Sequence, residues 1–294
     1  MAVTEIGITN RRARAMDFVE LTKPRITFMV LISTIVGFYM GAEGPLQALL
    51  LFHTVVGTAF VASGASALNQ YFERDLDARM NRTRNRPIPD GRLIPGDALA
   101  FSLAISALGV SYLAIFVNPL TAVLGAFTLG AYILIYTPLK TRTTWCTLIG
   151  AFPGAIPPLM GWAATRGNLD LTGLSLFAIL FLWQMPHFFA IAWMFTEDYA
   201  RAGFIVHGSS VNTGRQIIFY GCALIPVSLL PTVLGATGRW YLIGALLLGF
   251  IYLGYGFAVA LFRSITHAQR LLKISVLYLP ALFALMMIDK LKNN

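Results

Sequence analysis

The sequence predicts an all-α fold, a polytopic bundle of about nine transmembrane helices around a central cavity that opens to the cytoplasmic face. Two observations predict this class. Hydrophobic residues make up 57% of the 294 residues and charged residues only 12%, about half the charged share of a soluble domain. The apolar runs approach the roughly 20 residues that a helix needs to cross a bilayer, and they lack the period-2 alternation of a membrane β-barrel.

Nine apolar segments are expected to span the membrane, at residues 26–40, 46–67, 98–117, 120–136, 147–164, 174–195, 216–234, 241–262 and 271–288. The first and fourth are short for a span. Pro153, Pro157 and Pro158 lie inside the fifth, which predicts a kinked or broken helix, a feature tolerated where neighbouring helices or a cavity satisfy the freed backbone. A short interfacial helix is expected before the first span, carrying Arg11, Arg12, Arg14, Phe18 and Leu21.

The chain is expected to form a single domain over residues 1–294, with a cytoplasmic N-terminal segment at 1–25 and no cleavable signal peptide. Two four-helix units, at about 46–164 and 174–288, are expected to form a repeat, because each carries an acidic patch near its first inter-helix loop. The two cysteines show no metal-ligand spacing and are interpreted as packing residues.

Lysine and arginine residues divide unequally between the two sets of loops. Eighteen lie in the N-terminal segment and after the second, fourth, sixth and eighth spans; the other four are Arg166, Arg239, Lys290 and Lys292. Cytoplasmic loops carry the excess of basic residues, so the N-terminus is predicted to be cytoplasmic. A bacterial inner membrane is favoured, with an organelle protein lacking its presequence left open. The net charge of +9 is thus mainly a topology signal and does not indicate nucleic-acid binding.

Acidic residues are scarce, thirteen in all, and a group of them follows the second span. If that span continues as a helix, Asn69, Glu73 and Asp77 stand at i, i+4 and i+8 and line one face. Three acceptor groups converging at the mouth of a bundle are unfavourable unless a cation lies among them. Oxygen ligands without nearby His or Cys suit Mg²⁺, which bridges carboxylates to substrate phosphates.

Arginines follow these acids directly, at Arg82, Arg84 and Arg86. The guanidinium group can donate two parallel hydrogen bonds to phosphate oxygens. Carboxylates, an implied metal ion and arginines within one short stretch therefore predict a diphosphate site. The alternative interpretation is a solvated loop of mixed ion pairs.

A second acidic element, Glu197 and Asp198, follows the sixth span and is expected on the same face as the first. His187 lies inside that span, and an ionisable side chain within the membrane usually indicates a functional site. An interhelical hydrogen bond that satisfies the imidazole is an equally good interpretation. His207 and His267 are interpreted as solvated loop residues.

These motifs resemble the intramembrane aromatic prenyltransferase superfamily, whose mark is Asn-Asp-x-x-Asp-x-x-x-Asp after the second helix. Asn69, Glu73 and Asp77 match its first, third and fourth marked positions, with Glu73 replacing an aspartate, whereas Gln70 replaces the other aspartate. Within the superfamily the chain is similar to the protohaem IX farnesyltransferase (haem O synthase) branch over nearly its whole length. The matching segments are 21–25, 69–87, 136–140, 154–162, 183–188 and 198–203. Residues 204–207 depart from that branch's pattern.

The resemblance implies transfer of a farnesyl group from farnesyl diphosphate to a vinyl group of haem B, giving haem O, with Mg²⁺ as cofactor. The implied metal ligands are Asn69, Glu73, Asp77, Glu197 and Asp198. The implied catalytic residues are Asn69, Glu73, Asp77, Arg82 and Lys140. The implied substrate-binding residues are Arg86, Arg142, His187, Asp198 and Tyr136. The lipid bilayer is an implied partner, and a haem-modifying enzyme or terminal oxidase is a further one.

Three other functions compete with this interpretation. A secondary transporter would place charged residues near the membrane midplane, whereas the acids here gather at one face. A non-catalytic assembly or lipid-scaffold protein leaves the ligand-spaced triad unexplained. Within the prenyltransferases, an aromatic acid of quinone biosynthesis is the alternative acceptor.

Overall fold

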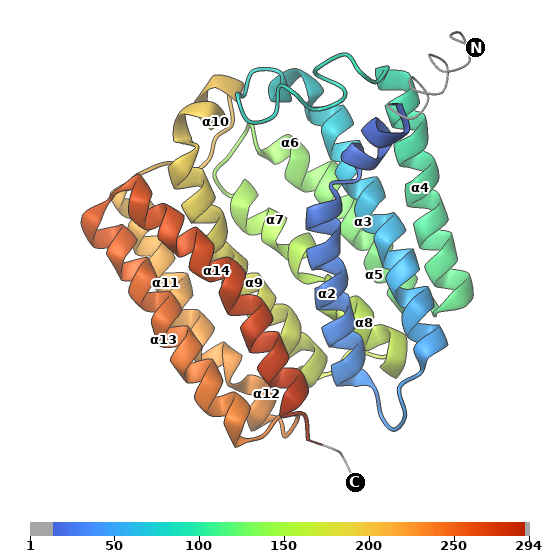
Figure 1. Ribbon diagram of the computed structural model, residues 1–294, viewed down its shortest axis with the longest axis vertical. Helices are drawn as coiled ribbons and strands as arrows, with labels where there is room; N and C mark the ends of the chain where they lie inside the picture. The colour runs from blue at the N-terminus through green and yellow to red at the C-terminus, as the bar shows by residue number, and fades with distance from the viewer. Residues whose placement is uncertain (1–13, 292–294) are drawn as a thin grey trace, which may run out of the picture.

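The computed structural model describes residues 14–291, which are almost entirely helical (Figure 1). Within that range nine segments are long and apolar enough to cross a membrane, as predicted. They are α2 (Pro24–Gly41), α3 (Ala48–Asp77), α4 (Pro95–Phe116), α5 to α6 (Pro119–Leu139), α7 with α8 (Cys146–Arg166), α9 (Leu171–Met194), α11 with α12 (Val211–Val233), α13 (Arg239–Phe262) and α14 (Ile265–Ile288). The predicted cations Arg11, Arg12 and Lys292 lie outside the described residues.

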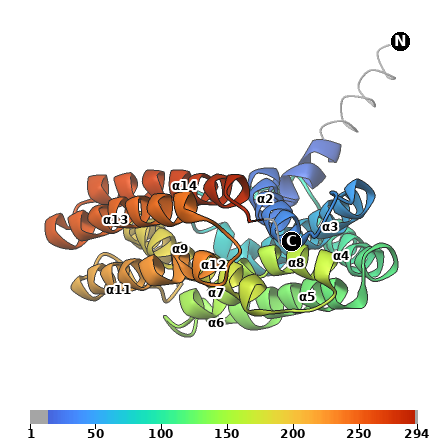
Figure 2. The same cartoon turned by 90° about the horizontal axis from the view of Figure 1, so that it is seen from below.

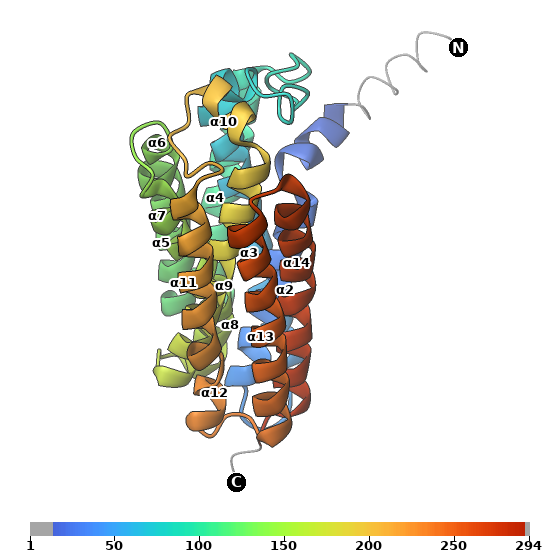
Figure 3. The ribbon, with the colours of Figure 1, turned by 90° about the vertical axis from the view of Figure 1, so that its left-hand side faces the viewer.

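The spanning helices lie roughly along the long axis of the molecule (Figures 1 and 3). The short helix α10 (Thr196–Ala202) and the loop between α3 and α4 lie together at one end. Seen along the bundle, α9, α11, α13 and α14 gather on one side and α3, α4 and α5 on the other (Figure 2). This arrangement is that of a multi-pass membrane protein. The division into two repeated four-helix units stays a prediction.

The fifth span is broken where the prolines predict it. Helix α7 (Cys146–Ala155) ends two residues before Pro157, which begins α8 (Pro157–Arg166). Proline has no backbone N–H to continue the helix ladder. Helix α8 then crosses α2 at very short range. A Cβ atom on Gly161 would lie only 1.9 Å from the carbonyl oxygen of Thr34, so only glycine fits at this crossing. Small residues at such crossings let two helix backbones approach each other closely.

The fourth span contains a π-helix. Helix α5 (Pro119–Gly130) passes into π-helical turns over Ala131–Tyr136 before the short helix α6 (Thr137–Leu139). Short π-helical stretches of this kind are found frequently at functional sites. The rings of Tyr132 and Tyr136 lie together within it, with centroids 5.1 Å apart.

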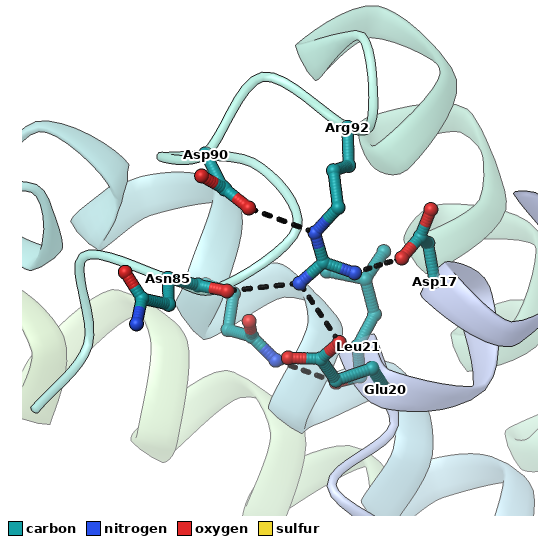
Figure 4. Close-up of polar contacts among 7 residues, drawn as sticks. Asp17, Glu20, Leu21, Asn85, Asp90 and Arg92 are labelled. Carbon is teal, nitrogen blue, oxygen red and sulfur yellow. Dashed lines mark hydrogen bonds and ion pairs between the residues drawn. The ribbon is translucent and has the colours of Figure 1, made fainter. Parts of the chain in front are cut away.

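A short helix over residues 14–21 precedes α2, as predicted for the interfacial segment. Arg92, from the loop between α3 and α4, holds it in place (Figure 4). The Arg92 guanidinium donates to the carboxylate of Glu20 at 2.9 Å and to that of Asp90 at 3.0 Å, and it also pairs with Asp17. A single arginine therefore joins the N-terminal helix to the loop that follows α3.

Candidate active site

The polar face of α3 contributes three of the side chains that line the site. The helix runs unbroken to Asp77, which confirms that Asn69, Glu73 and Asp77 follow one another at helical spacing. All three side chains are buried. They line a cavity of about 240 Å³ at the end of the bundle that carries the loop between α3 and α4.

Charged groups of both signs line this cavity, with positive charge in excess. The cations are Lys23, Arg82, Arg86 and Lys140, and the anions are Glu73 and Asp77. Lys140 Nζ lies 2.6 Å from Glu73 Oε1, and Arg86 Nη1 lies 2.6 Å from Asp77 Oδ2. Lys23 and Arg82 form no ion pair with either carboxylate. The cavity therefore favours a small polyanion.

Lys23 lines the cavity but was not among the predicted site residues. Its backbone has a φ of 48° immediately before Pro24, a strained conformation for a non-glycine residue and one that tends to occur at functional sites. Its Nζ atom donates to Asn69 Oδ1 at 3.1 Å. Burial, followed by the nearby Arg86, lowers the pKa of Lys23 to about 7. The Lys-Pro step ahead of the first span was the available signal.

Gln70, the departure from the superfamily pattern, belongs to the packing around the site. Its Nε2 atom donates to the carbonyl oxygen of Leu21 at 2.9 Å, and its side chain is not part of the cavity lining. The glutamine ties α3 to the N-terminal helix. Its presence therefore leaves the carboxylates inside the cavity unchanged.

The oxygen atoms of α3 fit a hard divalent cation. No three His, Cys, Asp or Glu side chains among residues 14–291 lie close enough to hold a metal ion by themselves. Asp77 Oδ1, however, is buried and accepts no hydrogen bond within the same residues. Glu73 and Asn69 supply further oxygen atoms to the cavity. Mg²⁺ is usually held by one or two carboxylates, with substrate phosphates and water completing its shell, and this donor set suits that mode.

The second acidic element is placed differently from the prediction. Glu197 is exposed at the start of α10 and lies outside the cavity lining. Asp198 is buried, but its carboxylate accepts from the backbone N–H groups of Asn81 and Arg82, both at 3.4 Å, and pairs with Arg201. These bonds hold α10 against the loop that follows α3. The structure thus brings the two loops together as expected, yet neither carboxylate joins the predicted metal ligands.

His187 makes an interhelical hydrogen bond, one of the two interpretations left open by the sequence. Its Nδ1 atom lies 2.7 Å from Ser275 Oγ on α14. The imidazole ring stacks on Trp183, with centroids 5.1 Å apart. His187 does not line the cavity, so its predicted substrate contact is not supported.

The tyrosines of the π-helix complete the wall beside the cations. Tyr136 lines the cavity as predicted, and Lys140 Nζ lies 4.6 Å from the centroid of its ring. Tyr132 lines the same wall and was missed, because nothing in the sequence indicates the π-helix that turns both rings inward. Arg142 is exposed and lies outside the cavity lining.

The rest of the cavity wall is largely apolar. Its side chains include Ile26, Phe188, Ile191, Phe204 and Val206. Charged groups and apolar side chains within one cavity suit an amphiphile with a polyanionic head and a hydrocarbon tail. Bundle and cavity together define a membrane enzyme for substrates of that kind.

Comparison with known proteins identifies the family of this chain. Residues 30–278 match the UbiA prenyltransferase family. A protein of Solibacter usitatus (strain Ellin6076) named protoheme IX farnesyltransferase is 51% identical over 287 residues, which covers 93% of this chain and 98% of the relative. The chain belongs to the UbiA prenyltransferase family.

Solved structures share the fold at low sequence identity. The structure of a digeranylgeranylglyceryl phosphate synthase superposes with a TM-score of 0.79 at 16% identity, covering 94% of this chain and 98% of that one. A UbiA homologue from Archaeoglobus fulgidus, bound to GPP and Mg²⁺, gives a TM-score of 0.62 at 14% identity, covering 92% and 99%. These likenesses show a shared fold.

Proposed function

We propose that the protein transfers a farnesyl group from farnesyl diphosphate to a vinyl group of haem B, giving haem O. The observation that carries this proposal is the cavity whose lining combines four cations and two carboxylates with apolar side chains. The farnesyl chain requires the apolar side chains and the diphosphate requires the charged ones. The name of the Solibacter usitatus relative, 51% identical over nearly the whole chain, supports haem as the acceptor.

Mg²⁺ is the proposed cofactor, and Asn69, Glu73 and Asp77 are the residues that would hold it. When bound, it supplies positive charge against the diphosphate and so stabilises the leaving group. The Archaeoglobus fulgidus homologue was solved with both GPP and Mg²⁺, which supports the use of a divalent ion with a prenyl diphosphate in this fold.

The cations of the cavity bind and stabilise the departing diphosphate. Arg82, Arg86 and Lys140 would donate to its oxygen atoms, an electrostatic contribution that grows as charge develops on the leaving group. The bond between farnesyl carbon and diphosphate oxygen breaks, and its electron pair leaves with the diphosphate. The vinyl π electrons of haem B form the new carbon–carbon bond. Water then adds to the resulting porphyrin-side cation and releases a proton, which gives a hydroxyethylfarnesyl substituent.

The apolar wall has a second role in this reaction. Phe188 and Ile191 of α9, together with Phe204, exclude bulk water from the farnesyl cation. Water that reached the allylic carbon first would give farnesol and no coupled product. The acceptor must therefore lie closer to that carbon than solvent does.

We place the protein in a bacterial inner membrane, with the N-terminus and the cavity on the cytoplasmic side. The unequal distribution of lysine and arginine supports this orientation. Haem O made there would pass to a haem-modifying enzyme or to a terminal oxidase.

The test is a comparison of two acceptors. Purified protein in lipid nanodiscs is given farnesyl diphosphate and Mg²⁺, with either haem B or 4-hydroxybenzoate, and the products are identified by mass. The proposal expects farnesylated haem, its loss when EDTA removes the divalent ion, and no prenylated benzoate. A prenylated benzoate without farnesylated haem would assign the protein to quinone chemistry instead.

A further inference from the structure

A second cavity, of about 440 Å³, lies beside the diphosphate cavity among α7, α9, α11 and the segment that precedes α11. Trp145, Phe189, Phe219 and Tyr220 give it broad aromatic walls. Thr147 lines both cavities, so the two spaces adjoin each other.

The segment at residues 204–208 separates the two cavities. It is neither helix nor strand, and Ile205 N–H donates to the carbonyl oxygen of Lys140 at 2.7 Å. Phe204 and Val206 line the diphosphate cavity, whereas His207 lines the second one. One stretch of backbone thus shapes both spaces.

His207 is a half-buried cavity residue, which corrects its interpretation as a solvated loop histidine. Its ring meets the Phe189 ring edge-on, with centroids 5.8 Å apart. Burial lowers its pKa, which favours the neutral imidazole. Neutral imidazole is the form that binds a metal ion.

We propose that this second cavity binds the haem acceptor and that His207 is an axial ligand of its iron. The inference rests on the proposed function, because it takes haem as the acceptor. Flat aromatic side chains suit the faces of a macrocycle, and a histidine among them supplies the usual protein ligand for haem iron. A lipid chain would gain nothing from the imidazole.

The surroundings of the cavity fit the remaining parts of a haem molecule. Thr144 and Gln216 are polar residues of the lining that can donate hydrogen bonds to the propionates. The side chains of Trp145 and Phe219 are 64% and 66% exposed, so an amphiphilic porphyrin can enter from the bilayer. Contact through Thr147 brings the edge of the macrocycle towards the farnesyl diphosphate.

The test is a haem titration without farnesyl diphosphate, followed by absorption and electron paramagnetic resonance. Wild-type protein is expected to show a histidine-ligated haem. His207→Ala should lose that signature and bind haem about tenfold more weakly or worse, and added imidazole should restore the signature. His207→Met should instead give the spectrum of thioether ligation. His267→Ala is the matched control, because His267 lines neither cavity and its Nδ1 atom lies 2.7 Å from Ser264 Oγ.

Metal-free protoporphyrin IX measures the contribution of the aromatic walls to binding without that of the iron. It should bind wild type and His207→Ala with equal affinity. Equal haem spectra and affinities for these two proteins would overturn the assignment. Farnesylated haem from both, with the same KM for haem, would also overturn it while leaving the proposed function intact. Haem bound through His207 but never farnesylated would support the site and refute the function.

Discussion

Single residues of α3 differ sharply in their surroundings. Asp75 and Asp77 are two positions apart, yet their side chains are 77% and 0% exposed. Only Asp77 lines the cavity, because residues two apart on a helix point to different faces. Burial with one unbonded oxygen atom is costly unless a ligand uses that oxygen. We therefore assign Asp77 to substrate and metal binding and Asp75 to the surface.

Asp77→Asn should lower the rate of farnesyl transfer about a hundredfold, corresponding to roughly 3 kcal/mol of barrier. The amide keeps the shape of the side chain but removes the negative charge that would hold the divalent cation. Steady-state rates across a Mg²⁺ titration measure the effect. Asp75→Asn is the control and should behave as wild type, and an equal loss in both variants would contradict the assignment.

Helices and the contacts between them place the cations of the site. Lys23 precedes α2, so its position depends on how α2 and the N-terminal helix are held. Arg92 fixes the N-terminal helix from one side, and the glycine crossing with α8 fixes α2 from within the bundle. Neither contact touches the cavity, yet both control its geometry.

Arg92→Ala should loosen the N-terminal helix without unfolding the bundle. The paired guanidinium is about one-third exposed, so the loss in global stability should stay near 1 kcal/mol. Hydrogen exchange over residues 14–21 should rise, and the KM for farnesyl diphosphate should rise with it. Arg84→Ala, from the same loop and exposed, serves as the control. Unchanged exchange in Arg92→Ala would show that other contacts hold the helix.

Gly161→Ala should destabilise the whole protein. The new methyl group would lie 1.9 Å from a backbone oxygen of α2, and backbone cannot move aside as a flexible side chain can. Overpacking of this kind costs about 1–3 kcal/mol or more, which thermal unfolding in detergent would detect as a lower Tm. Gly254→Ala is the control, since no atom outside its own helix backbone lies within 4 Å of its Cβ position. An unaltered Tm in Gly161→Ala would contradict the close crossing.

At the scale of the whole molecule, much of the fold is predictable from hydropathy. The apolar runs predict the nine spans found in residues 14–291, because a bilayer demands helices of a set length. Helical periodicity likewise predicts the shared face of Asn69, Glu73 and Asp77. The placement of Asp198 and His207 is not predictable in this way, since it depends on the path of loops that have no periodicity. Lys23 lies in the matching segment 21–25, yet its place in the cavity was missed because the sequence does not show the backbone turn, with a φ of 48°, that precedes α2.

The orientation of the bundle can be tested with a membrane-impermeant thiol reagent in a Cys222→Ser background. Arg84→Cys lies in the loop beside the cavity, and Asn168→Cys lies at the opposite end, between α8 and α9; both positions are exposed. The distribution of basic residues predicts labelling of Asn168→Cys in intact spheroplasts and of Arg84→Cys only after permeabilisation. The reverse pattern would place the cavity outside.

The haem composition of membranes tests the central claim most directly. The protein is expressed in a bacterial host without its own haem-farnesylating activity, and haem is extracted from the membranes and identified by mass. Wild type should yield haem carrying a hydroxyethylfarnesyl group, and Asp77→Ala, present at an equal level, should yield only haem B. Haem B alone from both, or farnesylated haem at equal levels from both, would contradict a farnesyl transfer that depends on the α3 carboxylates.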